Sequence, residues 1–194
     1  MDSRLAFHRH IIDVSQKVRK LSYVFRQLRH AVDSKVMRNI YLALCHSVLS
    51  YGSTIWGCAA KSHLIMLERA QRLILKVSHC KPRLYPTKQL YRECKILTVR
   101  QTYILATILR QHSLLNFSSE HPLANTRRHH AVCVVFSGST KFCRKFFKYQ
   151  GGRLYNMANK LLNVYSKTKF HCGTIVSDWL QKFDYTETEY ILTK

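Results

Sequence analysis

The fold class of this chain is decided by residues 62–78, which read SHLIMLERAQRLILKVS. Apolar side chains recur there at spacings of three and four residues, which places them on one face of an α-helix. The inward positions are Leu64, Leu67, Ala70, Ile74 and Val77. Arg69, Arg72 and Lys76 cluster on another face, and the basic run continues through Lys81, Arg83, Lys88 and Arg92. An amphipathic helix with a basic outer surface is predicted, and the length of the basic run favours phosphate binding over an ordinary solvated face.

The same spacing predicts further helices on both sides of this one. They cover residues 17–29, 34–48, 87–94 and 99–116. The hydroxyl of Ser34 is placed to cap the second of these helices, and Thr98 is placed to cap the last. Apolar residues surround the 99–116 helix almost completely, so it is either central to the core or docked on another chain.

The composition changes after residue 116. We expect a helical domain at residues 1–116, a polar linker at 117–130 and a basic module with an acidic tail at 131–194. Within the module, 131–136 is predicted as a strand, 141–149 as a second strand or a basic helix, Gly151-Gly152 as a break, and 154–164 and 175–183 as helices. The expected fold class is mainly α, a helical bundle followed by a small α+β or irregular C-terminal module.

The charge of the chain points to a polyanionic partner. Lys and Arg number 32 against 10 Asp and Glu, which gives a net charge of +22, and residues 121–177 contain no acid at all. Nucleic acid is therefore the first partner to consider. A disordered basic tail is excluded because 46% of the residues are hydrophobic.

The sequence gives little support for a metal site, a disulfide framework or a membrane-spanning helix. The seven cysteines form no CxxC pair, so we expect free thiols rather than a disulfide framework or a zinc finger, and no cofactor. His129 and His130 near Cys133 and Cys143 match no metal-ligand spacing. A Cys/His nucleophile site is also considered, but the sequence contains neither a Gly-rich phosphate loop nor a nucleophile elbow that would support it. No apolar run is long enough to span a membrane, so we expect an intracellular protein of the nucleus or cytoplasm.

Several separated motifs resemble one protein family. In chain order they are LSYVFRQLR (21–29), IYLALCHSVLSYG (40–52), Trp56-Gly57, LERAQR (67–72), YPTKQLY (85–91), ILTVRQ (96–101), Leu154-Tyr155-Asn156 and Trp179-Leu180. Together they resemble the thumb and post-thumb region, C-terminal to the palm, of non-LTR retrotransposon reverse transcriptases of the jockey-like, insect kind. The resemblance covers about residues 15–194.

This resemblance implies a helical thumb that grips an RNA/DNA primer–template duplex. The residues it places near the nucleic-acid backbone are Lys17, Arg19, Lys20, Arg26, Arg29, Arg69, Arg72 and Lys76. Tyr23 shares the basic face of its helix and is expected to stack on a base. The other partners implied are the missing palm domain or another chain.

The catalytic chemistry of that family is missing from the sequence. Its polymerases hold two Mg²⁺ ions on closely placed aspartates, and this chain has no Asp-Asp pair. We therefore expect no enzyme activity from the chain alone, no catalytic residue and no metal site. It is interpreted as a truncated RNA-directed DNA polymerase fragment that retains at most nucleic-acid binding. The alternatives are a helical interaction module that docks on another chain and a non-functional genomic remnant.

Overall fold

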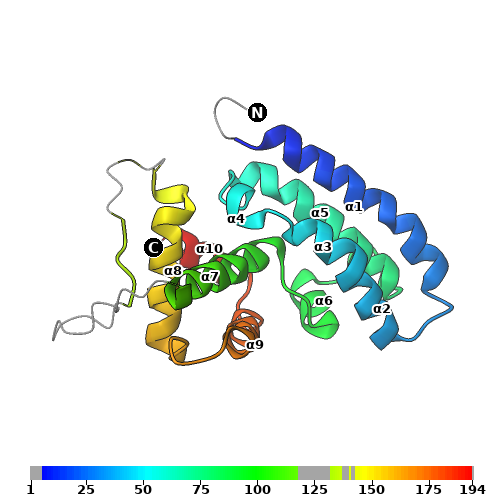
Figure 1. Cartoon of the computed structure of the whole chain (residues 1–194). Coiled ribbons are helices and arrows are strands. Elements are labelled where there is room, and N and C mark those ends of the chain that lie inside the picture. The colour runs from blue at the N-terminus through cyan, green and yellow to red at the C-terminus, as the bar shows by residue number, and fades with distance from the viewer. Residues whose placement is uncertain (1–5, 118–131, 137–139, 141–142, 194) are drawn as a thin grey trace. The chain divides into compact units, whose positions relative to one another are not determined.

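The computed structural model describes residues 6–117, 132–136, 140 and 143–193, and these residues are mainly helical, as expected (Figure 1). The α-helices are α1 (His8–Leu28), α2 (Ser34–Tyr41), α3 (Ser47–Ser50), α4 (Ser53–Trp56), α5 (Lys61–Ser78), α6 (Thr87–Cys94), α7 (Val99–Phe117), α8 (Phe147–Leu162), α9 (Lys169–Leu180) and α10 (Tyr185–Thr193). A π-helical turn, η1 (Leu42–His46), joins α2 to α3, and a 3₁₀ turn, η2 (Cys143–Lys145), precedes α8.

Contacts divide the chain into an N-terminal unit, Met1–Thr102, and a C-terminal unit, Tyr103–Lys194. The division falls within α7. The expected linker at 117–130 lies almost entirely outside the described residues, so the domain boundaries predicted from composition stay a prediction. None of the helices in the described part of the chain is long and apolar enough to cross a membrane. All seven cysteines are free, as predicted.

In the N-terminal unit, α1 and α5 lie side by side and run in the same direction (Figure 1). Near their N-termini the rings of His8 and His63 are 4.5 Å apart. Two turns further on, Ser15 Oγ donates a hydrogen bond of 3.4 Å to the carbonyl oxygen of Met66. Because α1 and α5 are parallel, their C-termini lie at the same end of the unit.

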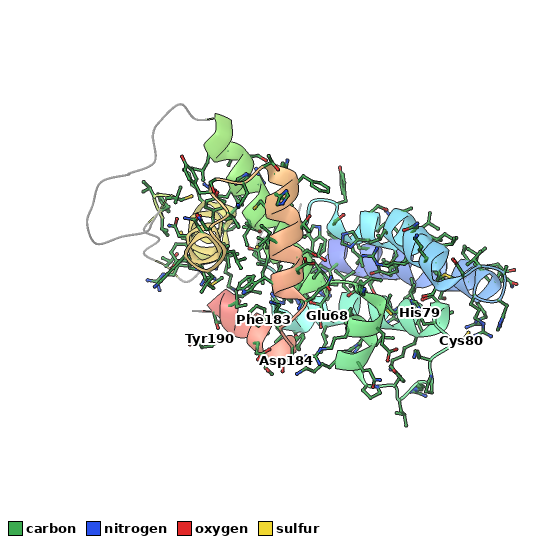
Figure 2. The ribbon with its side chains drawn as sticks, turned by 90° about the horizontal axis from the view of Figure 1, so that it is seen from below. Glu68, His79, Cys80, Phe183, Asp184 and Tyr190 are labelled. Atoms are coloured by element: carbon green, nitrogen blue, oxygen red, sulfur yellow. The ribbon has the colours of Figure 1, made fainter. Side chains whose placement is uncertain are left out.

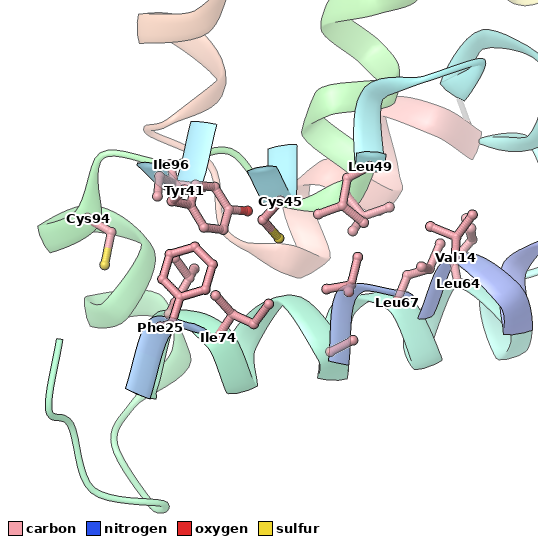
Figure 3. Close-up of a cluster of buried hydrophobic side chains, with 14 of the residues drawn as sticks. Val14, Phe25, Tyr41, Cys45, Leu49, Leu64, Leu67, Ile74, Cys94 and Ile96 are labelled. Carbon is pink, nitrogen blue, oxygen red and sulfur yellow. The ribbon is translucent and has the colours of Figure 1, made fainter. Parts of the chain in front are cut away.

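The segment α2–η1–α3 packs across these two helices and completes the core (Figure 3). Met37, Tyr41, Cys45 and Leu49 are all buried, although positions four residues apart drift by about 40° per step on a regular α-helix. The wider π-helical turn absorbs this drift and keeps all four side chains on the inner face. The predicted cap was wrong by one residue, since Asp33, not Ser34, accepts the 2.8 Å bond from the backbone N–H of Val36.

In the C-terminal unit, the second half of α7 packs against α8 and α9. His112 Nδ1 lies 2.8 Å from the hydroxyl of Tyr155 on α8, and the guanidinium of Arg110 lies 4.4 Å from the ring centre of Phe147. Leu109 lies against Gly173 of α9. These contacts favour the core interpretation of this helix over docking on another chain.

Two predictions for the C-terminal module were wrong. The described residues 132–136 form no strand, because the side chain of Asn156 takes the place of a neighbouring strand. Its Oδ1 accepts bonds from Val132 and Cys133, and its Nδ2 donates 2.8 Å to the Cys133 carbonyl. Gly151 and Gly152 do not break the chain but lie inside α8. At Gly152 the missing side chain leaves room for the Val134 carbonyl. Residues 143–149 are the 3₁₀ turn and the start of α8, so the helical alternative holds there.

Candidate nucleic-acid interface

The candidate site begins at the C-terminus of α5, where a Schellman motif reverses the chain. The N–H of Lys81 donates 2.9 Å to the carbonyl of Lys76, and the N–H of Cys80 donates 3.4 Å to that of Val77. Cys80 itself adopts the left-handed conformation, with a φ of 51°. Figure 2 shows His79 and Cys80 at this turn. The reversal brings residues 81–83 back beside α5, and Lys76 Nζ donates a 2.5 Å bond to the carbonyl of Arg83.

An open groove of about 610 Å³ lies at this end of the N-terminal unit. Its lining residues are Arg29, His30, Leu73, Lys76, Val77, Cys80, Lys81, Pro82 and Arg83. The first two follow the C-terminus of α1, and the others come from the end of α5 and the turn after it. The lining includes four Lys or Arg residues and no acidic residue.

Two stripes of side chains, all exposed except the half-buried Lys76, lead along the helices to this groove. The α1 stripe is Arg19, Tyr23, Arg26 and His30, and the α5 stripe is Arg69, Leu73, Lys76 and Cys80. The first three members of each stripe are four and three residues apart, which keeps them on one side of the helix, and His30 and Cys80 follow just beyond the helix ends. We call the line between the two stripes the seam. Because the helices are parallel and the end of each stripe lines the groove, the stripes flank the seam.

Contacts to neighbouring helices support this placement of the α1 stripe. Arg19 and Arg26 follow Ser15, which touches α5, by about one and three helical turns, so they lie on the α5 side. Tyr23 is 67% exposed, which leaves its ring free to meet a ligand. Six predicted site residues are therefore brought to the seam or the groove: Arg19, Tyr23, Arg26, Arg29, Arg69 and Lys76.

The other three predicted residues lie elsewhere. Lys17 follows His10 by two turns, and the His10 ring is 5.9 Å from that of Trp56, so Lys17 is on the α4 side of α1. Lys20 is exposed on the outer face, about 160° around the helix from buried Val18. Arg72 lies near Tyr91 of α6 and acts to lower the pKa of that tyrosine, although burial raises it overall.

A hydrogen-bonded cluster beside the groove neutralises one of its cations. Lys81 Nζ lies 2.7 Å from Glu93 Oε2, and Tyr85 and Gln89 donate to Glu93 Oε1 at 2.5 and 2.9 Å. Lys81 and then Tyr85 are the main causes that lower the pKa of Glu93 to about 2. The same carboxylate raises the pKa of Lys81. Arg29, Lys76 and Arg83 are the groove cations that this carboxylate does not pair.

Among the groove residues, His30 and Cys80 were not predicted, and Lys81 and Arg83 were predicted only as part of the basic run that favours phosphate binding. The sequence gives only a partial signal for two of them: His30 and Cys80 continue the spacing of Arg19 and Arg69 after eleven residues, but both lie just beyond the ends of their helices. Lys81 and Arg83 belong to the basic run, but their return to α5 depends on a left-handed cysteine that no sequence rule anticipates. Among the described residues, no group of three or more His, Cys, Asp or Glu is placed to hold a metal ion.

A comparison with known proteins finds one whose sequence is similar to part of this chain. The chain is 30% identical over 100 residues to the RNA-directed DNA polymerase from mobile element jockey of Drosophila melanogaster. This chain contains a region similar to an RNA-directed DNA polymerase of a mobile element. The similarity covers 50% of the chain and 11% of that polymerase. No family model matches the chain, and no solved structure matches it.

Proposed function

We propose that the chain binds the phosphate backbone of nucleic acid along the seam, as the thumb-like grip of a reverse transcriptase on an RNA/DNA primer–template duplex. The observation that carries the proposal is the convergence of the two stripes on an acid-free groove. The related polymerase copies RNA into DNA, as its name states, so a primer–template duplex is the natural ligand to test.

The charge and shape of the seam suit a duplex backbone. Arg19 and Arg26 belong to the α1 stripe, and Arg69 and Lys76 belong to the α5 stripe, so each of the two neighbouring helices contributes cations to an elongated surface. Lys and Arg contacts to phosphates release condensed counterions, and each contact adds about 0.9 to the slope of log affinity against log salt. Such contacts position a duplex without reading its sequence.

The proposal gives the chain a binding role and no catalytic step. The sequence has no adjacent aspartates to hold the two metal ions of nucleotidyl transfer. We further propose that the chain corresponds to a truncated part of such a polymerase that lacks the catalytic palm.

The test compares two double variants, each of which removes two positive charges from the N-terminal unit. Arg26→Ala/Arg69→Ala removes one cation from each stripe, whereas Lys17→Ala/Lys20→Ala removes two exposed cations that lie away from the seam. Binding to a fluorescent RNA/DNA primer–template hybrid is measured by anisotropy over a salt series, with light scattering to detect aggregates.

We expect the seam variant to bind more weakly across all sequences and to reduce the salt slope by about 2. The control variant should keep most of the wild-type slope. Equal losses in both variants would mean that the overall charge binds nucleic acid without a defined seam. If the monodisperse wild-type protein does not bind the hybrid at low salt, the proposed binding function is wrong. The two alternatives are then a helical module that docks on another chain and a non-functional genomic remnant.

A further inference from the structure

A turn joins α8 to α9 (Figure 1), and its residues include exposed aromatic and apolar side chains among lysines. We define the α8–α9 corner as Lys160, Leu161, Tyr165, Lys167, Lys169 and Phe170. Phe170 is 83% exposed, Leu161 59% and Tyr165 40%, and all three lysines are exposed as well. The corner lies in the part of the sequence without acids, residues 121–177.

The backbone of the corner is held in place by its own hydrogen bonds. Asn163 ends α8 in the left-handed conformation and donates 2.9 Å to the Asn159 carbonyl, while the side chain of Asn159 accepts from the Tyr165 N–H at 2.9 Å. Val164 is completely buried and anchors the turn, which a 3.1 Å bond from Lys167 to its carbonyl closes. Thr168 caps α9 by accepting from His171. The exposed rings therefore project from an ordered turn.

We propose that the α8–α9 corner binds single-stranded nucleic acid, with a base stacked on Phe170 and phosphates held by Lys167 and Lys169. An aromatic face contributes about 1 to 3 kcal/mol per stacked base, and nearby cations attract the backbone. This surface belongs to the C-terminal unit and takes a different ligand from the seam, so it does not rest on the function proposed above.

The chemistry of the corner fits this ligand better than a protein or a lipid surface. A stable protein interface buries about 800 Å² on each partner, which three separate side chains do not supply. A membrane-surface helix needs an apolar stripe that continues along its length. On α9 the positions that follow Phe170 on the same face are Thr174, Ser177 and Asp178, all of them polar. A flat base and its phosphates need only an aromatic ring beside cations.

The experiment measures binding of the full chain to a labelled oligothymidylate of about 12 nucleotides, which lies within the usual site size. Phe170→Ala should weaken binding about tenfold. Phe170→Tyr should retain it because the aromatic face is kept, and Phe170→Leu should behave like Phe170→Ala. Tyr51→Ala is the matched control, because Tyr51 is 81% exposed and no charged residue occurs between Ser47 and Gly57.

The proposal is overturned if Phe170→Ala binds the oligonucleotide like wild type, or if Phe170→Leu binds as tightly as Phe170→Tyr. It is also overturned if the loss of Phe170 abolishes binding to phosphatidylserine vesicles but not to oligothymidylate. Because Phe170 is exposed, its variants are expected to melt like the wild type. The seam variant Arg26→Ala/Arg69→Ala distinguishes the two binding surfaces. It should bind the duplex more weakly, whereas adding Phe170→Ala to it should still weaken binding to oligothymidylate.

Discussion

The hydroxyl of Tyr91 donates a hydrogen bond of 2.8 Å to Oε1 of Gln71 inside the N-terminal unit. The amide nitrogen of Gln71 in turn donates to the Tyr41 hydroxyl at 2.9 Å and to the Leu97 carbonyl at 2.8 Å. Gln71 is completely buried, so these bonds tie α5 to α2, to α6 and to the chain leading into α7 inside the core.

Replacing Gln71 with Leu is expected to destabilise the protein by about 3 to 5 kcal/mol, because it leaves two hydroxyls and a carbonyl buried without this partner. Chemical denaturation measures the change in the free energy of unfolding. Gln27→Leu is the control, since Gln27 is exposed on α1 and its loss should change stability by less than about 0.5 kcal/mol. Similar values for the two variants would show that the network adds nothing to the core.

Cys80→Gly is expected to stabilise the protein by about 0.5 to 1 kcal/mol, because glycine occupies the left-handed position of a Schellman motif without steric strain. Cys80→Ala should give no such gain, since alanine retains the Cβ that causes the strain. Thermal melting of both variants distinguishes them. A gain of equal size in both would assign the effect to loss of the thiol.

Glu93→Gln should release Lys81 from its ion pair and increase the salt slope for duplex binding by about 1. Asp13→Asn removes the same charge from an exposed site on α1 and should leave the slope nearly unchanged. A slope that stays at the wild-type value in Glu93→Gln would remove Lys81 from the binding surface.

In the wild type, the pKa of Glu93 is lowered to about 2 by Lys81 and Tyr85, so the stability from this pair is complete above about pH 4.5 and is lost as the pH falls towards 2.

Gly152→Ala and Gly173→Ala should change stability in opposite directions. A Cβ at position 173 would lie 3.6 Å from the nearest atom of Leu109, an ordinary contact, so the helix gains about 0.5 to 1 kcal/mol from the better helix former. At position 152 it would lie 3.1 Å from the carbonyl oxygen of Val134, in a segment that Asn156 holds in place. We expect a loss of about 1 kcal/mol there by chemical denaturation. A gain at both positions would mean that the 132–136 segment moves aside easily.

The helices that the sequence predicted best have clear ends. The helix predicted at 87–94 is α6 with the same bounds, because Pro86 directly precedes it and stops any earlier start. Thr98 caps α7 as expected, and its reciprocal partner is Gln101. By contrast, α1 begins at His8 rather than near residue 17, since Ile11, Val14 and Val18 continue its buried face upstream.

The arrangement of the candidate site was harder to predict than its composition. Helical periodicity gives the face on which Arg26 or Arg69 lies, but it does not say which neighbour packs beside that face. The placement of Lys17 near α4 and of Arg72 near α6 depends on tertiary packing alone. The strand predicted near Val134 failed because a short apolar run does not reveal that a side chain, Asn156, will satisfy the backbone.

The parallel course of α1 and α5 has a further electrostatic consequence. Each helix ends in carbonyl groups that carry about half a negative charge, and both ends meet beside the groove. Arg29 and Lys76 therefore lie where the helix dipoles favour cations even before any phosphate arrives. The protein can therefore hold its basic residues together at this place with less mutual repulsion than an equally charged flat surface would have.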